Sequence, residues 1–528
     1  MRSWIRTIEA KAGPARLRRL LAGGVIGSLM ILFTLASSRE PAAAVTSDSP
    51  VLPGICRPSD RFGLSTTGGQ ILEYDVGKLH AGWYHNFWIL EGAPRPADMT
   101  YVQTIRLAKG PAEGDRACSL CPGRSCCPTW SELSNMVQAS PGAIWLIGNE
   151  PDTIASKQDN IPPLRYAELY KQFYDFLKEH DLSCLVGIAG VVQPTPIRLQ
   201  YLTMILDAYQ AQNGEPMPID VWNTHNYLLR EKRYGLPDSW GAGIPPGIDA
   251  DEGILYDIPD GDLLDPCVPQ QPPDPDDPHC ADKIGWKQQL IDLRQFMKAK
   301  GYQDRPLVIS EYGILMPLDY GFDYVTVKAF MLATFEWLRD TTDPDIGYPA
   351  DGNHLVQAWN WYPFDIDVFG GMPGNAHLFD PALHTLTPVG TAFGDYTEPL
   401  TDAYPGTVDL RTVSVMDGPP ISGANGLVDV TITADILNAG ASPSGSAVVR
   451  FDYGAQAREI GVQDVGPGEV RAVQDTWLGQ LGDWIDVHVT ATATQAIDCD
   501  PYNNDLSAHL WVTEHTFYLP VVGRAPNH

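Results

Sequence analysis

The sequence predicts an α/β protein, a (β/α)8 barrel followed by a smaller all-β sandwich, and three observations lead to this fold class. Eight strand-like apolar runs follow one another between residues 60 and 364, and most of them end at polar or aromatic residues. Amphipathic helical patterns lie between several of these runs. After about residue 400 the pattern changes to short alternating runs separated by Gly, Pro and Asn.

The strand-like runs alternate with helices, which is typical of a parallel sheet with helical crossovers. In chain order the runs are 61–69, 82–90, 100–108, 143–152, 185–192, 219–227, 306–315 and 355–364. Helices are expected at 163–180, 286–300 and 324–339. Eight such units in about 300 residues fit a barrel better than a doubly wound sheet.

The C-terminal part reads as an all-β sandwich of about 110 residues. Its expected strands are 407–415, 427–437, 446–453, 470–477, 484–493 and 506–512. We therefore expect a barrel domain over 51–398, a sandwich over 405–515 and a tail over 516–528.

The N-terminus has the pattern of an export signal. Six basic residues precede an apolar segment from Leu20 to Ala36, and Ala42-Ala43-Ala44 then resembles a cleavage site. The apolar segment is near the lower limit for crossing a bilayer, so we favour cleavage over a retained membrane anchor. Residues 1–50 are excluded from the fold, and the mature protein is expected outside the cell.

Composition limits the partners. The chain has 528 residues, 44% of them hydrophobic, and a net charge of -29. Such an acidic protein is not expected to bind nucleic acid or anionic membranes. A neutral carbohydrate substrate stays possible, and we expect a monomer, with cell-surface association through the sandwich or the N-terminal segment as an open possibility.

The nine cysteines favour disulfides over metal in an exported chain. Cys118, Cys121, Cys126 and Cys127 are expected to staple one loop, and Cys267 with Cys280 a second. The odd total leaves at least one free thiol, for which Cys184 is a candidate. An acidic insertion from about Arg230 to Asp282 is read as a solvated lid, with calcium binding the less favoured alternative because no complete calcium-loop spacing is present. We expect neither a metal site nor a cofactor.

Polar side chains gather at the ends of the expected barrel strands. Asn149 and Glu150 end the fourth, His225 and Tyr227 the sixth, and Glu311 the seventh. The carboxyl ends of barrel strands meet at one face, which brings the two glutamates across its mouth. Glycoside cleavage needs such a pair, one acting as acid and the other as nucleophile or base. The sequence therefore predicts a glycoside hydrolase.

A family resemblance supports this prediction. The motifs GNEPD with Glu150, H-x-Y at 225–227 and SEYG with Glu311 resemble the clan A glycoside hydrolases. With GWYHNFW and the tryptophans near residue 360, the barrel looks most like the alkali-sensitive-linkage-type endo-β-1,3-glucanases. The resemblance implies a retaining mechanism with Glu150 as acid/base and Glu311 as nucleophile. It also implies that Asn149 contacts the sugar 2-hydroxyl and that His225 and Tyr227 lie near Glu311.

A second resemblance concerns the sandwich. ILNAG at 436–440 and CDPYNNDL at 499–506 resemble small bacterial immunoglobulin-like modules related to cell-adhesion domains. This likeness implies an immunoglobulin-like sandwich without indicating what the module binds.

Three tryptophans are candidate platforms on which a sugar ring could stack. Trp359 and Trp361 are two residues apart and point the same way on a strand, so they are either core residues or a platform, and we favour the platform. Trp83 and Trp88 fall on opposite faces, and we expect Trp83 to line the mouth.

Each glutamate also has a structural alternative. Asn149 and Glu150 could start a helix, and Glu311 could form a structural ion pair. Their joint placement favours catalysis, with the carboxyl groups about 5 Å apart as retention requires. The predicted function is an exported retaining hydrolase of a β-linked polysaccharide, with β-glucan favoured. The rival is a carbohydrate-binding protein on an inactive barrel. Esterase, zincin and nucleotide-binding motifs were not found.

Overall fold

The structure is a computed structural model. It describes residues 52–66, 71–107, 128–153, 158–229, 231, 241–248, 285–316, 318, 321–369, 372–423 and 426–513. The predicted export signal, the two predicted disulfide loops and most of the acidic insertion lie outside these residues. Within them, no helix has the length and apolar character needed to cross a membrane.

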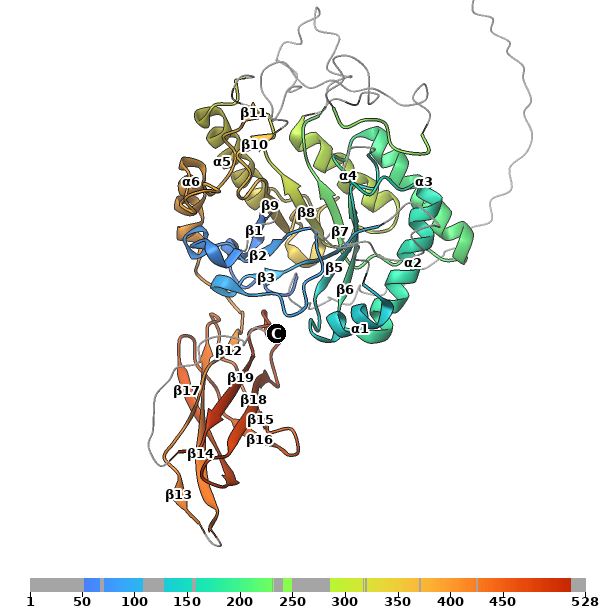
Figure 1. Cartoon of the computed structure of the whole chain (residues 1–528). Helices are drawn as coiled ribbons and strands as arrows, with labels where there is room; N and C mark the ends of the chain where they lie inside the picture. The colour runs from blue at the N-terminus through green and yellow to red at the C-terminus, as the bar shows by residue number, and fades with distance from the viewer. Residues whose placement is uncertain are drawn as a thin grey trace, which may run out of the picture. The chain divides into compact units, whose positions relative to one another are not determined.

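The N-terminal part of the described chain contains parallel strands with helices between several of them (Figure 1). They are β1 (Phe62–Ser65), β2 (Trp83–His85), β3 (Thr100–Tyr101), β4 (Gln103–Ile105), β5 (Ile144–Asn149), β6 (Leu185–Gly190), β7 (Trp222–His225), β8 (Leu307–Tyr312) and β9 (Ala358–Trp361). One sheet has the order β3-β2-β1-β9-β8-β7 and the other β4-β5-β6, with parallel pairing throughout.

The two sheets meet at two places. β3 and β4 come from a single predicted strand that is interrupted at Val102, whose N–H donates to the Tyr84 carbonyl at 3.0 Å. On the other side, Gly187 of β6 forms a parallel bridge with Val221, directly before β7. Neighbouring strands follow the order expected for a barrel. The hydrogen-bonded ladders nevertheless form two separate sheets, so closure of the barrel stays a prediction.

Helices cover these strands (Figure 1). They are α1 (Trp130–Gln138), α2 (Pro163–His180), α3 (Pro196–Asn213), α4 (Trp286–Ala299), α5 (Tyr324–Asp340) and α6 (Pro388–Thr397). α2 has the predicted bounds because Pro163 suits the first helical position and its apolar residues repeat on one face. The first crossovers contain the short 3-10 turns η2 (Ile71–Glu73), η3 (Val76–Leu79) and η4 (Pro96–Asp98). These turns explain why helical patterns were missing from that part of the sequence.

Both faces of the parallel strands are buried. In β5, Trp145 and Ile147 join the large core beneath the helices, whereas Ile144 and Leu146 join a second apolar cluster on the opposite face. Alternation along a strand sends successive side chains to opposite faces, so a strand covered on both sides reads as a continuous apolar run.

The C-terminal region consists of two antiparallel sheets. One contains β12 (Leu410–Asp417), β13 (Ile421–Ser422), β14 (Val428–Asn438) and β17 (Val470–Gly479), and the other β15 (Ala447–Asp452), β16 (Ala457–Val462), β18 (Trp484–Ala493) and β19 (Asp505–Trp511). A small hairpin, β10 (Val368–Phe369) and β11 (Met372–Pro373), precedes them. Apolar residues from both sheets form one shared core. Strict alternation of buried and half-buried residues in β14 shows why period two was readable in the sequence.

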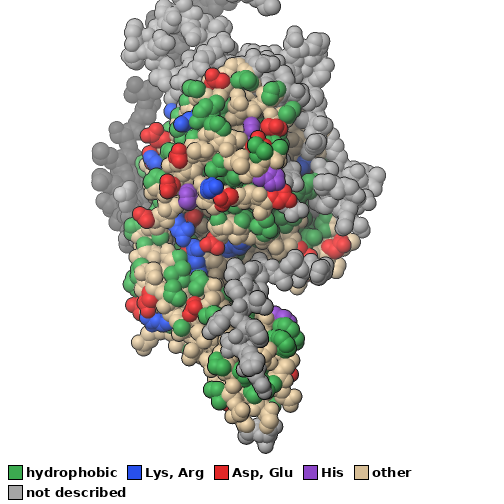
Figure 2. Space-filling view, turned by 60° about the vertical axis from the view of Figure 1, so that its left-hand side comes forward, with side chains coloured by type: hydrophobic (Ala, Val, Ile, Leu, Met, Phe, Trp, Pro, Cys, Tyr) green, Lys and Arg blue, Asp and Glu red, His purple; other side chains and the backbone are tan. Residues whose placement is uncertain are grey.

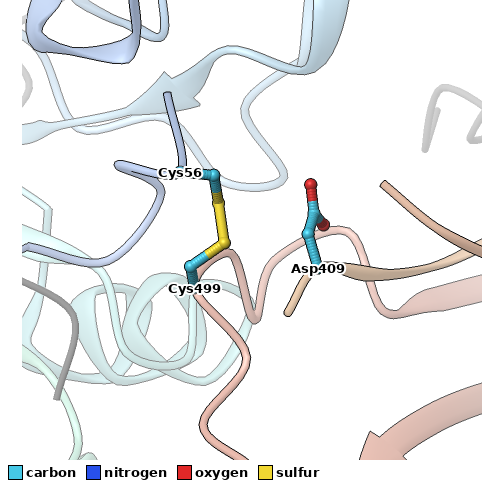
Figure 3. A group of neighbouring side chains, drawn as sticks. All are labelled: Cys56, Asp409 and Cys499. Atoms are coloured by element: carbon cyan, nitrogen blue, oxygen red, sulfur yellow. A yellow bond between two sulfur atoms is a disulfide. The ribbon is translucent and has the colours of Figure 1, made fainter. Parts of the chain in front are cut away.

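A disulfide between Cys56 and Cys499 joins residues 443 positions apart and lies beside Asp409 (Figure 3). The Arg95 guanidinium also donates to Asp500 at 2.8 Å. The sequence did not indicate this pairing, because both cysteines stand alone in the chain. Cys184 is buried and free, which confirms the expectation for that thiol.

Candidate functional site

Two glutamates face each other at the carboxyl ends of the parallel strands. Glu150 directly follows β5 and Glu311 lies in β8. One carboxylate oxygen of Glu150 lies within 4.8 Å of one carboxylate oxygen of Glu311, which is compatible with the separation of about 5 Å expected for this pair. Each residue is 6% exposed, so both are strongly desolvated while keeping a contact with solvent.

His225, at the end of β7, lies between the two carboxyl groups. Its Nδ1 is 2.9 Å from Glu150 Oε1 and its Nε2 is 3.2 Å from Glu311 Oε1. The ladder between β7 and β8 shifts register at His225, an irregularity that re-aims side chains and is common beside functional sites. The imidazole thus contacts both carboxyl groups, one through each ring nitrogen.

Gly190 makes room for this imidazole. A Cβ atom at position 190 would come within 2.5 Å of His225 Cδ2, so a larger residue would displace the ring. The Gly190 carbonyl also accepts the backbone N–H of Glu150 at 3.0 Å. Sequence reasoning missed Gly190, because a glycine at the end of an apolar strand has no distinctive pattern.

Tyr227 fixes the second carboxylate. Its hydroxyl donates to Glu311 Oε2 at 2.9 Å, and the side chain is buried. Burial, with the negative charge of Glu311 next, raises the pKa of Tyr227 well above its usual value, which keeps this hydroxyl protonated as a donor.

The pKa values of Glu311 and His225 are both shifted from their ordinary values. Burial raises the pKa of Glu311 to about 7, with Glu150 adding to the rise, while His225 and the Tyr227 hydroxyl act in the opposite direction. Burial by itself would lower the pKa of His225, but the carboxylates of Glu311 and Glu150 outweigh it and raise that pKa. We conclude that an imidazolium beside two carboxyl groups makes their coexistence possible at short range.

Glu150, His225 and Glu311 could also be considered as metal ligands, since one ligand atom from each lies within 4.8 Å of the others. A metal-binding imidazole must offer a deprotonated nitrogen. Both nitrogens of His225 face carboxyl oxygens, and its raised pKa favours the protonated form. The arrangement is therefore better suited to proton transfer than to metal binding.

Glu150 is held in an unusual backbone conformation. Its φ is 44°, in the left-handed region that costs a non-glycine residue about 1–3 kcal/mol and clusters at functional sites. The first described helix after β5 begins only at Pro163, so Asn149 and Glu150 do not start it. Asn149 is buried beside Glu150, and its side-chain amide donates to Gln158 Oε1 at 2.8 Å.

Buried ion pairs support the loops around the site. Asp159 accepts the Arg106 Nε at 2.7 Å and the backbone N–H of Asn149 at 2.8 Å. Arg198 joins Asp152, after β5, to Glu231, after β7, and the side chains of all three are fully buried. These contacts tie together the chain segments that present Glu150 and His225.

The tryptophan predictions need correction. Trp359 packs edge-on against Phe62, and Trp361 donates through Nε1 to the Ala376 carbonyl; both are at most 1% exposed and belong to the core beneath the helices. They point the same way, as predicted, but toward the helices. Trp83 lies in the apolar cluster that includes Val102 and Ile144, at the opposite end of the strands from Glu150. None of the three contributes a platform beside the glutamates.

Aromatic residues that the sequence reasoning did not single out lie at the site instead. Tyr362 follows β9, is buried against Tyr227, and has Phe87 and Leu315 in the same small cluster. Burial raises the pKa of Tyr362, with Glu311 and Glu150 as the next causes. Its position one residue after Trp361, on the opposite face of the strand end, was the available signal.

No protein-family model and no curated protein matches this chain. Among solved structures, a glycoside hydrolase family 86 protein in complex with neoagarooctaose is similar at 10% identity, covering 82% of this chain and 81% of that chain, with a TM-score of 0.37. A Bacteroides uniformis β-glucuronidase is 10% identical over 88% of this chain and 47% of its own length, with a TM-score of 0.33. A CARDB domain from Pyrococcus furiosus in complex with di-metal ions covers 20% of this chain and 90% of that domain at 18% identity, with a TM-score of 0.17.

The larger structural neighbours are thus glycoside hydrolases at low identity, and this chain spans less than half of the β-glucuronidase. The assignment of function therefore depends on the geometry of the site.

Proposed function

We propose that this protein is a retaining glycoside hydrolase that cleaves a β-linked polysaccharide, with β-glucan favoured. The observation that carries the proposal is the short separation of the Glu150 and Glu311 carboxylate oxygens, within 4.8 Å. Inverting enzymes place their carboxyl groups roughly 6.5–9.5 Å apart to admit a water molecule, whereas retaining enzymes need about 5 Å.

The reaction takes place in two displacements. A carboxylate oxygen of Glu311 attacks the anomeric carbon while the Glu150 carboxyl group gives its proton to the departing glycosidic oxygen. This breaks the glycosidic bond and forms a glycosyl ester with Glu311. Glu150 then takes a proton from water, whose oxygen attacks the same carbon and releases Glu311. The net change is hydrolysis with retained anomeric configuration.

The surrounding residues support these roles. Tyr227 donates to the oxygen of Glu311 at 2.9 Å, which favours the ionised form that a nucleophile needs. His225 contacts both glutamates, and its positive charge favours the ionised form of Glu311. With a pKa of about 7, Glu311 is ionised in about half of the free molecules at neutral pH, so activity should rise above pH 7.

The remaining assignments belong to the same proposal. They comprise a closed (β/α)8 barrel over 51–398, an immunoglobulin-like sandwich over 405–515, and the barrel resemblance to alkali-sensitive-linkage-type endo-β-1,3-glucanases. Export is supported by the Cys56–Cys499 disulfide, since such bonds persist in oxidising compartments.

The test is hydrolysis of a panel of β-glucans, xylans and mannans, with the product anomer followed by NMR. Glu311→Gln and Glu150→Gln should each lower turnover by at least about 10³-fold, because each removes a group that reacts directly. Glu336→Gln, at an exposed position on α5, is the matched control and should retain full activity. Near-wild-type activity of E311Q, or an inverted product, would contradict the proposal.

The rival function is carbohydrate binding without cleavage, and the low exposure of both glutamates, 6% each, is the observation that favours it. This rival would be selected if the wild-type chain is retained on a polymer of the panel and releases no reducing ends at every pH tested between 5 and 9.

A further inference from the structure

The C-terminal sheet β16-β15-β18-β19 has one face turned away from the sandwich core. Along β18, Ile485, Val487 and Val489 are buried in that core, whereas the residues between them point outward. Two of the outward side chains are tryptophans in direct cross-strand register, Trp484 of β18 and Trp511 of β19. Each is 55% exposed.

These rings stack with a histidine ring on the same face. The imidazole of His509 stacks on Trp484 with ring centroids 4.2 Å apart and an interplanar angle of 6°. Trp511 lies 5.8 Å from Trp484 at 21°. Asp486 accepts a hydrogen bond from His509 Nδ1, which holds the imidazole in place. The result is an ordered aromatic stack, and an ordered ring loses little conformational entropy when it binds a ligand.

Two further apolar side chains are exposed near the connection from β17 to β18. Leu478, at the end of β17, and Leu481, in the turn before β18, are 53% and 45% exposed. Figure 2 shows hydrophobic side chains gathered on the lobe formed by the C-terminal sheets, next to a histidine. Two neighbouring indoles left in water expose apolar surface that a ligand would bury, and exposed apolar patches mark interaction sites.

Polar groups on the same face indicate the chemistry of the partner. His488 contacts Ser507 Oγ at 2.9 Å and lies 3.8 Å from Asp505, so hydroxyl, imidazole and carboxylate groups continue the face from the aromatic stack. A sugar ring offers an apolar C–H face to an aromatic ring and hydroxyl groups to such polar side chains. The carboxylates of Asp486 and Asp505 and the net charge of -29 disfavour anionic polymers and anionic membranes.

We propose that this face, defined by Trp484, Asp486, His488, Ser507, His509 and Trp511, binds a neutral polysaccharide chain. The inference rests on the proposed function in its choice of a β-linked glucan as the ligand. The stack lies at the start of β18, whereas the Cys56–Cys499 disulfide follows the end of that strand. The face is therefore a second binding site, separate from the glutamates, and it holds the enzyme on its polymeric substrate.

Binding and cleavage are measured separately so that the two proposals can fail independently. Retention by soluble and insoluble neutral β-glucans is measured by affinity electrophoresis and sedimentation in the inactive E311Q chain. Turnover of short soluble oligosaccharides is measured in the otherwise wild-type chain. The double variant W484A/W511A should bind the polymer at least 10-fold more weakly and hydrolyse the oligosaccharides at an unchanged rate. W484F/W511F should keep most of the retention, because a phenyl ring still stacks.

W130A is the matched control, since it removes a 37% exposed indole from α1 and should not affect retention. Unchanged retention of W484A/W511A would overturn the proposal, as would a wild-type chain that cleaves oligosaccharides but binds none of the polymers. Two other results, each with polymer retention unchanged in W484A/W511A, would also overturn the proposal. If the variant loses a concentration-dependent dimer, the face binds a second copy of the chain. If it loses binding to neutral phosphatidylcholine vesicles, the face binds a membrane.

Discussion

The two ends of the parallel strands differ sharply in chemistry although the same strands build both. At the amino end, Leu52, Ile55, Trp83, Ile144 and Val308 form an apolar cluster. At the carboxyl end, the strands present carboxyl, imidazole and phenol groups within hydrogen-bond distance of one another. Along β8, only two residues separate Val308 of the first group from Glu311 of the second.

This difference separates stability from chemistry. Apolar burial at the amino end stabilises the fold by roughly 25 cal/mol per Å². Desolvated carboxyl groups at the carboxyl end oppose folding unless they are paired, as the raised pKa of Glu311 shows. The comparison predicts that substitutions at the amino end change stability and leave the pH profile of activity alone, while substitutions at the carboxyl end change how activity and stability depend on pH.

The largest expected effect is that of Trp83→Ala. Trp83 is 6% exposed and donates through Nε1 to the Arg61 carbonyl at 3.2 Å, so its removal leaves a large cavity. The free energy of unfolding should fall by about 3–5 kcal/mol, measured by urea denaturation with circular dichroism. Trp484→Ala, at an exposed position, is the control and should cost less than about 1 kcal/mol. A W83A chain of normal stability that binds oligosaccharide poorly would place Trp83 in the substrate site after all.

Removing the charge of Glu311 should stabilise the fold in alkali. The folded-state pKa of about 7 lies above the ordinary 4.5, so the stabilising contribution of the protonated group is complete below pH 4.5 and is lost as the pH rises through 7. E311Q should therefore be more stable than the wild type by about 1–3 kcal/mol at pH 8, since it does not ionise. The difference should vanish near pH 4, and thermal unfolding across this range measures it. Equal stability at pH 8 would show that the ionised carboxylate is fully compensated.

Tyr227→Phe should move the pH profile by a smaller amount. Loss of the hydrogen bond to Glu311 removes an influence that lowers the pKa of that carboxyl group, so its pKa rises. The ascending limb of kcat/KM should shift upward by about 0.5–1 pH unit, the equivalent of the net contribution of one ordinary hydrogen bond. Tyr170→Phe, whose hydroxyl donates to the Pro218 carbonyl, is the control and should leave the limb in place. A shift toward acid would mean that Tyr227 does not stabilise the ionised form.

A chelator should have the smallest effect. Because His225 faces carboxyl oxygens through both nitrogens, the carboxyl end of the strands needs no metal for the proposed reaction. Dialysis against EDTA should leave kcat/KM within about 20% of its starting value. This change is smaller than the change in kcat/KM expected from the loss of one hydrogen bond. Activity that is lost and then restored by a divalent cation would assign the three residues to a metal centre.

Much of the local structure was readable because it depends on local periodicity. Continuous apolar runs predicted β5 and β8, and a repeating apolar face predicted α2 with the observed bounds. The two glutamates could be paired because the carboxyl ends of parallel strands meet at one face. Where crossovers are short 3-10 turns, as before β2, the sequence offered no helical period to read.

Other features depend on partners distant in the chain. Period two shows that Trp359 and Trp361 share a face, but it cannot say whether that face meets the helices or the site. The space at Gly190 is defined by His225, and the partner of Cys56 is 443 residues away.

The positions of the two glutamates at strand ends can be read from the chain alone, because a strand's apolar run and its polar end are adjacent residues. The surroundings of those glutamates, and the rise that burial causes in the pKa of Glu311, follow from the folded arrangement. Desolvation and charge pairing depend on atoms brought together from separate strands, and no single stretch of chain contains that information.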